Sequence, residues 1–289
     1  MDTSELLKKV RKIEIKTRGL SNHIFSGEYH TAFKGRGMNF SEVREYQFGD
    51  DVRAIDWNVT ARFHHPFIKV FEEERELTVM LLVDVSESAA FGTVKQRKKD
   101  LITELCAVLA FSAINNNDKV GVIFFSEGVE KYIPPKKGKS HILLIIRELL
   151  SLEPKKNGTN IRDTLRFFNN AAKKRSIVFL VSDFLAAPHY QEALTIAARK
   201  HDMVGVHVYD RHDKELPPAG LIRMQDAETK QLRWVDASDR KVQEFYTRQF
   251  QEHARYCREA FIKSGAELLS IRTDEDYVKA LQAFFSKRI

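Results

Sequence analysis

Cysteine and long apolar runs are both scarce in this sequence of 289 residues. The two cysteines, Cys106 and Cys257, lie in segments with helical spacing and form neither a disulfide framework nor a metal-binding cluster, so we expect buried thiols. Apolar runs such as 177–181 have the length of strands and fall far short of the ~20 residues that cross a bilayer. The charged N-terminus lacks the apolar segment of a secretory signal, which favours a cytoplasmic protein without a transmembrane segment.

Common enzyme motifs are also missing. The sequence has no Gly-x-x-x-x-Gly-Lys-Ser/Thr phosphate loop, no full dinucleotide fingerprint and no Gly-x-Ser-x-Gly elbow. Nucleotide hydrolysis and covalent catalysis are therefore not predicted, and we expect a protein that is not an enzyme. Metal-assisted hydrolysis stays open as an alternative, with a histidine as the base, but no candidate has a diagnostic spacing: His64, His65, His189 and His207.

A formal charge of +7 at neutral pH allows a third function, a basic module that binds nucleic acid. The basic clusters are short and scattered, and no nucleic-acid-binding motif accompanies them. The run from Lys95 to Lys99 is typical of them, and we interpret it as a solvated helix or loop surface. Nucleic acid is therefore not an expected partner.

Two regions differ in their hydrophobic pattern. Residues 1–76 begin with a short amphipathic helix at 3–13 and continue with glycines, aromatics and alternation that predict a small β-rich module. Residues 77–289 predict an α/β domain with a doubly wound, mostly parallel sheet, because continuous apolar runs alternate with helical segments. The expected strands are 77–83, 119–125, 176–181 and 203–208, followed by a hairpin at 221–235, a helix at 240–264, a strand at 267–271 and a helix at 276–286.

Small oxygen-bearing side chains follow two of the expected strands and precede one helix. Asp84, Ser86 and Ser88 come after the first strand, Asp183 ends a later one, and Thr159 follows a glycine in a loop. Ligands bind at the carboxyl ends of the strands in such sheets, and hard oxygen ligands suit Mg²⁺ or Mn²⁺. The alternative is that Asp84 only caps a helix and the two serines satisfy turn backbone.

Taken together, these five residues resemble the metal-ion-dependent adhesion site of von Willebrand factor A domains, over roughly residue 77 to the C-terminus. The resemblance implies that the serines and the threonine bind the cation directly and that the aspartates act largely through water. It also implies an open coordination position, filled by a carboxylate from a partner protein.

A second group of residues lies in the N-terminal module. Its members are arginines, aspartates and a tryptophan that we expect to fix loops through ion pairs, or less readily to bind a partner: Arg44, Asp50, Asp51, Arg53, Asp56, Trp57 and Arg62. This run resembles the signature of the bacterial domain-of-unknown-function family fifty-eight, except that Asn39 stands where an acidic residue is more usual. The resemblance implies a protein that works with a MoxR-type AAA+ ATPase in the assembly or activation of other proteins. The predicted function is therefore divalent-cation-dependent protein binding.

Overall fold

The computed structural model describes residues 8, 11, 13, 39–72, 77–92, 96–154, 158–185, 189–225 and 231–288. Backbone contacts separate a small unit, Phe33–Leu77, from a larger one that includes Thr78–Ile289. The helix predicted at 3–13 lies outside the described residues, apart from Lys8, Arg11 and Ile13, which are helical.

The small unit contains two antiparallel strands, β1 (Asn39–Glu45) and β2 (Phe67–Glu72). A 3-10 turn, η1 (Val52–Ala54), and a short helix, α3 (Trp57–Phe63), lie between them in sequence. The sequence pattern indicated strands here but not α3, because seven residues are too few to show a helical period.

The larger unit is built on a sheet of six strands. In sheet order these are β10 (Glu267–Arg272), β7 (Asp202–Tyr209), β6 (Ile177–Ser182), β3 (Thr78–Asp84), β4 (Lys119–Phe125) and β5 (Val129–Lys136). All neighbours pair in parallel except β4 and β5, so the predicted mostly parallel α/β sheet is confirmed.

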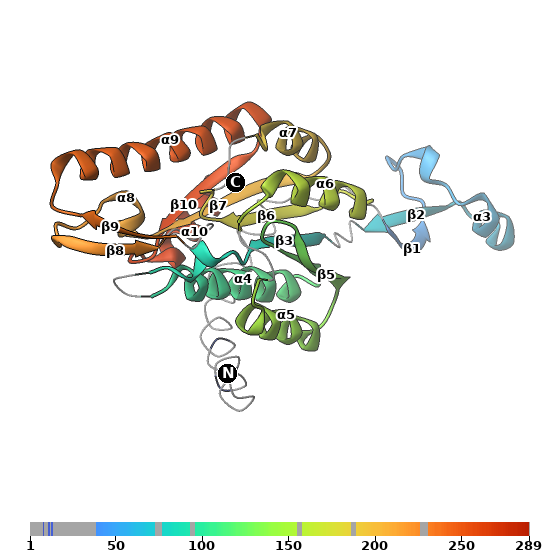
Figure 1. The fold of residues 1–289 in the computed structure, drawn as a ribbon. Coiled ribbons are helices and arrows are strands. Elements are labelled where there is room, and N and C mark those ends of the chain that lie inside the picture. The colour runs from blue at the N-terminus through green and yellow to red at the C-terminus, as the bar shows by residue number, and fades with distance from the viewer. Residues whose placement is uncertain are drawn as a thin grey trace. The chain divides into compact units, whose positions relative to one another are not determined.

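Helices cover both faces of this sheet (Figure 1). They are α4 (Lys98–Asn115), α5 (Lys139–Ser151), α6 (Ile161–Ala171), α7 (Gln191–Lys200), α8 (Arg211–Lys214), α9 (Arg240–Ser264) and α10 (Tyr277–Ser286). On one face α6, α7 and α9 lie side by side, and α4 and α5 pack together on the other. None of the described helices is long and apolar enough to span a membrane.

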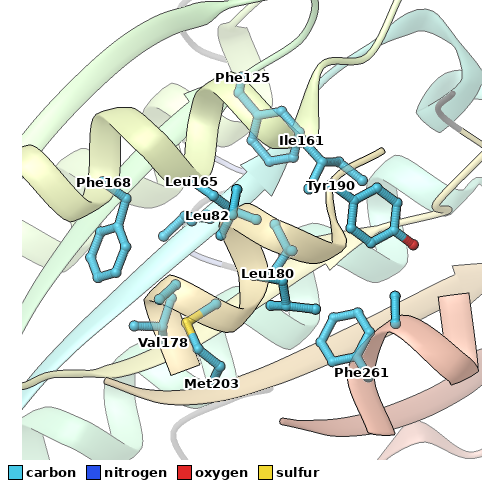
Figure 2. Close-up of a cluster of buried hydrophobic side chains, with 14 of the residues drawn as sticks. Leu82, Phe125, Ile161, Leu165, Phe168, Val178, Leu180, Tyr190, Met203 and Phe261 are labelled. Carbon is cyan, nitrogen blue, oxygen red and sulfur yellow. The ribbon is translucent and has the colours of Figure 1, made fainter. Parts of the chain in front are cut away.

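Continuous burial explains the apolar strands. Every residue of β6 is buried, and so is every residue of β3 and β4 except the first. Figure 2 shows one of the resulting core clusters, in which Leu82 and Leu180 of the sheet lie among Leu165 of α6, Phe261 of α9 and Tyr190, which precedes α7. Both cysteines are free and buried, as predicted.

Two β elements lie outside this regular pattern. The predicted hairpin is present as β8 (Leu221–Gln225) and β9 (Leu232–Asp236), which pair antiparallel. Strand β5 was not predicted, because its sequence includes Pro134 and Pro135 and is only partly buried. Proline has no amide hydrogen to donate, and it is tolerated there because β5 is an edge strand with a neighbouring strand on one side only.

Candidate functional site

The candidate site lies where the sheet reverses its order of strand addition. From β3 the chain adds β4 and β5 on one side and then returns to place β6 on the other. Adjacent loops diverge at such a switch point, and ligands of doubly wound sheets bind there. The register pairs Val83 with Val181, so Asp84 and Asp183 follow neighbouring strand ends.

Asp84 is buried, with 2% of its surface exposed, and both of its carboxylate oxygens accept hydrogen bonds. Oδ1 accepts from the Ser86 amide at 2.9 Å, and Oδ2 accepts from the Ser182 hydroxyl at 2.6 Å. Burial, and then the negative charge of Asp183, raise the pKa of Asp84 to about 6. The two carboxylates are therefore close enough to repel each other.

Two hydroxyl groups lie beside these carboxylates. Ser86 Oγ lies 3.0 Å from Ser88 Oγ, and the Ser88 hydroxyl is one of the groups that lower the pKa of Asp183. Ser86 precedes the short 3-10 helix η2 (Glu87–Ala90), but its side chain makes no capping hydrogen bond there. Local capping thus explains the hydrogen bond that Asp84 Oδ1 accepts. It does not explain why the Ser86 and Ser88 hydroxyls lie together.

Thr159 completes the arrangement from another loop. It follows Gly158, whose φ of 98° favours glycine, and comes just before α6. Ser86, Ser88 and Thr159 line one cavity of about 400 Å³. The structure therefore brings the three predicted hydroxyl ligands to one space, beside the buried Asp84 and Asp183.

Asp183 has a partner that the sequence did not indicate. Lys98 Nζ lies 2.9 Å from Asp183 Oδ2 and 3.0 Å from Asp213 Oδ2, with only 1% of the lysine side chain exposed. Burial alone would raise the pKa of Asp183, but the Lys98 ammonium holds it below its usual value. Our interpretation of Lys95–Lys99 as a solvated surface is therefore wrong for Lys98, whose ammonium contacts one carboxylate from the segment after β6 and one from α8.

One face of α9 forms another wall of the same cavity. Its side chains recur at helical spacing: Tyr246, Gln249, Phe250 and His253. These residues were missed because α9 was recognised from the sequence only as a long charged helix. The spacing was visible, but nothing in it indicated which side of α9 would face the strand ends.

The donor set fits a divalent cation. Hydroxyl and carboxylate oxygens are the ligands that Mg²⁺ and Mn²⁺ prefer. Asp84, Asp183 and Asp213 together with Lys98 amount to three carboxylates and one ammonium, which leaves a formal charge of minus two. In the part of the chain that the structure describes, no group of three or more His, Cys, Asp or Glu could hold a metal ion, so a site here depends on the hydroxyls.

Comparison with known proteins gives the family. Residues 42–256 match the family described as "Protein of unknown function DUF58". The chain belongs to the DUF58 family. "Uncharacterized protein Rv1480" of Mycobacterium tuberculosis is 28% identical over 290 residues, which cover all of this chain and 91% of that protein. "Uncharacterized protein YeaD" of Bacillus subtilis is 33% identical over 110 residues, or 38% of this chain and 25% of that protein.

Solved structures are similar to this DUF58 protein over most of its length. An aerotolerance-related membrane protein from Bacteroides fragilis covers 73% of this chain and 98% of its own, with 16% identity and a TM-score of 0.48. BatB from Bacteroides thetaiotaomicron covers the same shares, with 17% identity and a TM-score of 0.46. The SpRpn10 VWA domain covers 72% of this chain and 94% of its own, with 10% identity and a TM-score of 0.41.

The arginines and aspartates of the second candidate group make mostly local contacts in the small unit. The Arg44 guanidinium forms a two-point ion pair, or fork, with the Asp50 carboxylate, at 2.9 and 2.8 Å. Two aspartates instead cap helices: Asp51 accepts from the Arg53 amide at the start of η1, and Asp56 accepts from two amides of α3. Trp57 is 70% exposed, and the side chains of Arg53 and Arg62 are exposed as well. The exposed members are thus available to a partner.

The histidines of the hydrolase alternative are not part of the cavity lining. His207 is buried, with Nδ1 3.4 Å from Ser270 Oγ, and burial lowers its pKa to about 4. His189 lies on an exposed stretch of backbone, and His64 ends α3 in the small unit. The histidine that does line the cavity is His253 of α9.

Proposed function

We propose that this protein is a binding module that holds Mg²⁺ or Mn²⁺ and uses it to recognise a carboxylate of a partner protein. The observation that supports this most is the meeting of Ser86, Ser88 and Thr159 at one cavity, beside Asp84 and Asp183. The three hydroxyls come from two segments that are far apart in the sequence, and a purely structural role gives no reason for them to share a cavity.

Each residue has a distinct task in this proposal. The hydroxyls of Ser86, Ser88 and Thr159 are the direct ligands, because they line the cavity. Asp84 and Asp183 are both buried. Asp84 fixes the turn by accepting from the Ser86 amide, and the charge of both carboxylates favours a cation. The bound cation supplies positive charge at the cavity, which a partner carboxylate can approach.

The α9 wall gives the cavity a second recognition surface. Tyr246 and Phe250 present aromatic rings, and the Tyr246 hydroxyl is already used as a donor to the His212 carbonyl at 2.9 Å. A cavity of about 400 Å³ is near the lower end of the size of small-ligand pockets, which is enough for a side chain that protrudes from a partner. We therefore expect recognition of a protruding acidic residue.

We further propose that the partner is a MoxR-type AAA+ ATPase and that the two proteins meet in the cytoplasm. This part rests on the resemblance of the signature residues and on the membership of the DUF58 family. The exposed Arg53, Trp57 and Arg62 of the small unit offer additional contacts for such a partner.

The test is a binding measurement between the purified full chain and the purified ATPase, by biolayer interferometry in Mg²⁺, in Mn²⁺ and in EDTA. We expect binding with either cation and none in EDTA. Ser88→Ala should weaken binding at least about tenfold, since a direct ligand is lost. The matched control is Ser151→Ala, whose hydroxyl bonds only the Arg147 carbonyl at 2.9 Å on the exposed end of α5. Equal binding in EDTA would contradict the proposal.

Metal-assisted hydrolysis has one observation in its favour, the presence of His253 in the cavity lining. The variant His253→Gln distinguishes the two functions. A binding module should still bind the partner in Mg²⁺ and not in EDTA in this variant, whereas a hydrolase that uses His253 as base would lose turnover of an ester or phosphoester substrate at neutral pH. We propose a binding role because the cluster of hydroxyls and carboxylates supports it, whereas the hydrolase alternative depends on His253 alone.

A further inference from the structure

Lys98 occupies an unfavourable position for a lysine. It is the first residue of α4, an 18-residue helix whose N-terminus carries partial positive charge. Its side chain is almost completely buried, with the ammonium 5.7 Å from the centre of the Phe91 ring. Burial and the helix dipole both act against an ammonium group here, so its two carboxylate partners must offset both effects.

These partners belong to the candidate cation site. Asp183 Oδ2 accepts a hydrogen bond from the Lys98 ammonium at 2.9 Å, and Asp183 Oδ1 accepts one from the Leu185 amide at 3.3 Å. Asp213 Oδ2 receives the same ammonium at 3.0 Å, and Asp213 lines the cavity together with Ser86 and Ser88. The lysine therefore places a positive charge beside the carboxylates that would attract a metal ion.

We propose that Lys98 acts as an internal counter-ion that competes with the divalent cation for the charge of Asp183 and Asp213, and so sets a low cation affinity in the free protein. This inference rests on the proposed function, because it concerns the same site. Two charges of the same sign a few ångströms apart repel each other strongly in a buried setting. The ammonium thus keeps the carboxylates in place before a cation binds, and it also opposes that binding.

This arrangement links the cation to the partner. A carboxylate brought by a partner adds negative charge at the cavity and offsets the repulsion from Lys98. The cation and the partner should therefore increase each other's affinity, as thermodynamic linkage requires. Without Lys98 the free protein should hold the cation tightly and gain less from the partner.

The experiment is a titration of Mn²⁺ into the metal-stripped full chain, with free Mn²⁺ followed by electron paramagnetic resonance. The test variant is Lys98→Met, which keeps the length of the side chain and removes its charge. The matched control is Lys99→Met on the next position of α4, because Lys99 Nζ donates to the Leu152 carbonyl at 3.1 Å. Circular dichroism and thermal unfolding establish that each variant is folded.

A second variant covers the case in which Lys98→Met does not fold. Loss of the Lys98 ammonium leaves two carboxylates unpaired, and the double variant Lys98→Met with Asp213→Asn removes the charge of one of them. We expect Mn²⁺ to bind Lys98→Met at least about tenfold more tightly than the parent, and the double variant at least about threefold more tightly. Lys99→Met should bind as the parent does.

The outcomes separate this inference from the proposed function. A folded Lys98→Met or double variant that binds Mn²⁺ no more tightly than the parent would overturn the inference, while saturable binding by the parent would leave the proposed function intact. Binding by Lys98→Met but not by the parent would support the competition and contradict the proposed cation dependence of the parent. No binding by any variant would overturn both.

Discussion

The Ser182 hydroxyl donates to Asp84 Oδ2 at 2.6 Å and so joins the ends of two neighbouring strands, β6 and β3. Ser182 Oγ also accepts a hydrogen bond from the Phe184 amide at 3.0 Å, which holds the hydroxyl in place. Ser182 is fully buried and does not line the cavity, so it acts by orienting Asp84. A site that depends on Asp84 should therefore depend indirectly on Ser182.

Ser182→Ala tests this dependence. Loss of one buried hydrogen bond should weaken Mn²⁺ binding about three- to tenfold, since Asp84 loses a fixed orientation. The matched control is Ser176→Ala, just before the other end of β6, where the hydroxyl donates to the Lys174 carbonyl at 3.1 Å. Mn²⁺ titrations that give equal affinities for both variants would show that Ser182 has no positioning role.

The stability of the fold should decrease in mild acid because of His201. Its ring is buried, Nδ1 accepts from the Ser176 amide at 3.2 Å, and Nε2 has no partner among the described residues. Burial lowers its pKa to about 4. In the unfolded chain the pKa returns to ~6.5. As the pH falls, the unfolded chain therefore takes up a proton before the folded protein does. The free energy of unfolding is highest above ~6.5 and decreases as the pH falls towards ~4.

His201→Gln removes this titration. Urea unfolding should show that the parent's free energy of unfolding falls between pH 7 and pH 5 by about 2 kcal/mol more than that of the variant. The exposed His189→Gln should retain the parent's pH dependence. His207, whose pKa burial lowers to about 4, contributes in the same direction and remains in both variants. An unchanged slope in His201→Gln would contradict the assignment.

Close packing of α9 on the sheet depends on Gly205 of β7. A methyl group at this position would collide with the Phe261 ring and would lie 2.8 Å from Leu268 Cδ1. Gly205→Ala should therefore lower the free energy of unfolding by about 1–3 kcal/mol in urea titrations. Gly128→Ala, where the added carbon meets nothing within 4 Å, should change it by less than about 0.5 kcal/mol. Addition of Phe261→Leu to Gly205→Ala should restore part of the loss.

The Arg44–Asp50 fork should control local order in the small unit. Asp50 Oδ2 accepts from Arg44 and also from the Gln47 amide at 2.8 Å, so it ties strand β1 to the following turn. Arg44→Lys loses the two-point geometry and should accelerate hydrogen exchange at the Gln47 amide. Arg53→Lys, at an exposed position, is the control and should leave that rate unchanged. Equal rates in both variants would contradict a role for the fork.

Continuous apolar strands were predictable because burial on both faces removes the need for polar alternation. The positions of Asp84 and Asp183 followed from this, since a strand end is visible in the sequence. Strand β5 was not predictable, because an edge strand with two prolines and half-exposed residues has no such signature. Lys98 was also missed, since its burial depends on Asp213, which only the fold brings near.

The α9 wall shows a similar limit. The spacing of Tyr246, Phe250 and His253 places them on one face of a helix, which the sequence reveals. Which surface that face meets depends on how α9 crosses the sheet, and this is decided by contacts such as Phe261 on Gly205. The five candidate residues could therefore be picked out together from the sequence, whereas the shape of the cavity beside them required the structure.

The most direct test of the proposed cation site is calorimetric titration of Mg²⁺ and Mn²⁺ into metal-stripped protein and into two variants, Asp84→Ala and Asp183→Ala. The exposed Asp100→Ala on α4 serves as the control, and circular dichroism checks that all proteins are folded. We predict saturable binding at one site in the parent and in the control, and its loss in both test variants. Absence of binding in the parent, or equal binding in the folded test variants, would contradict a cation site at these strand ends.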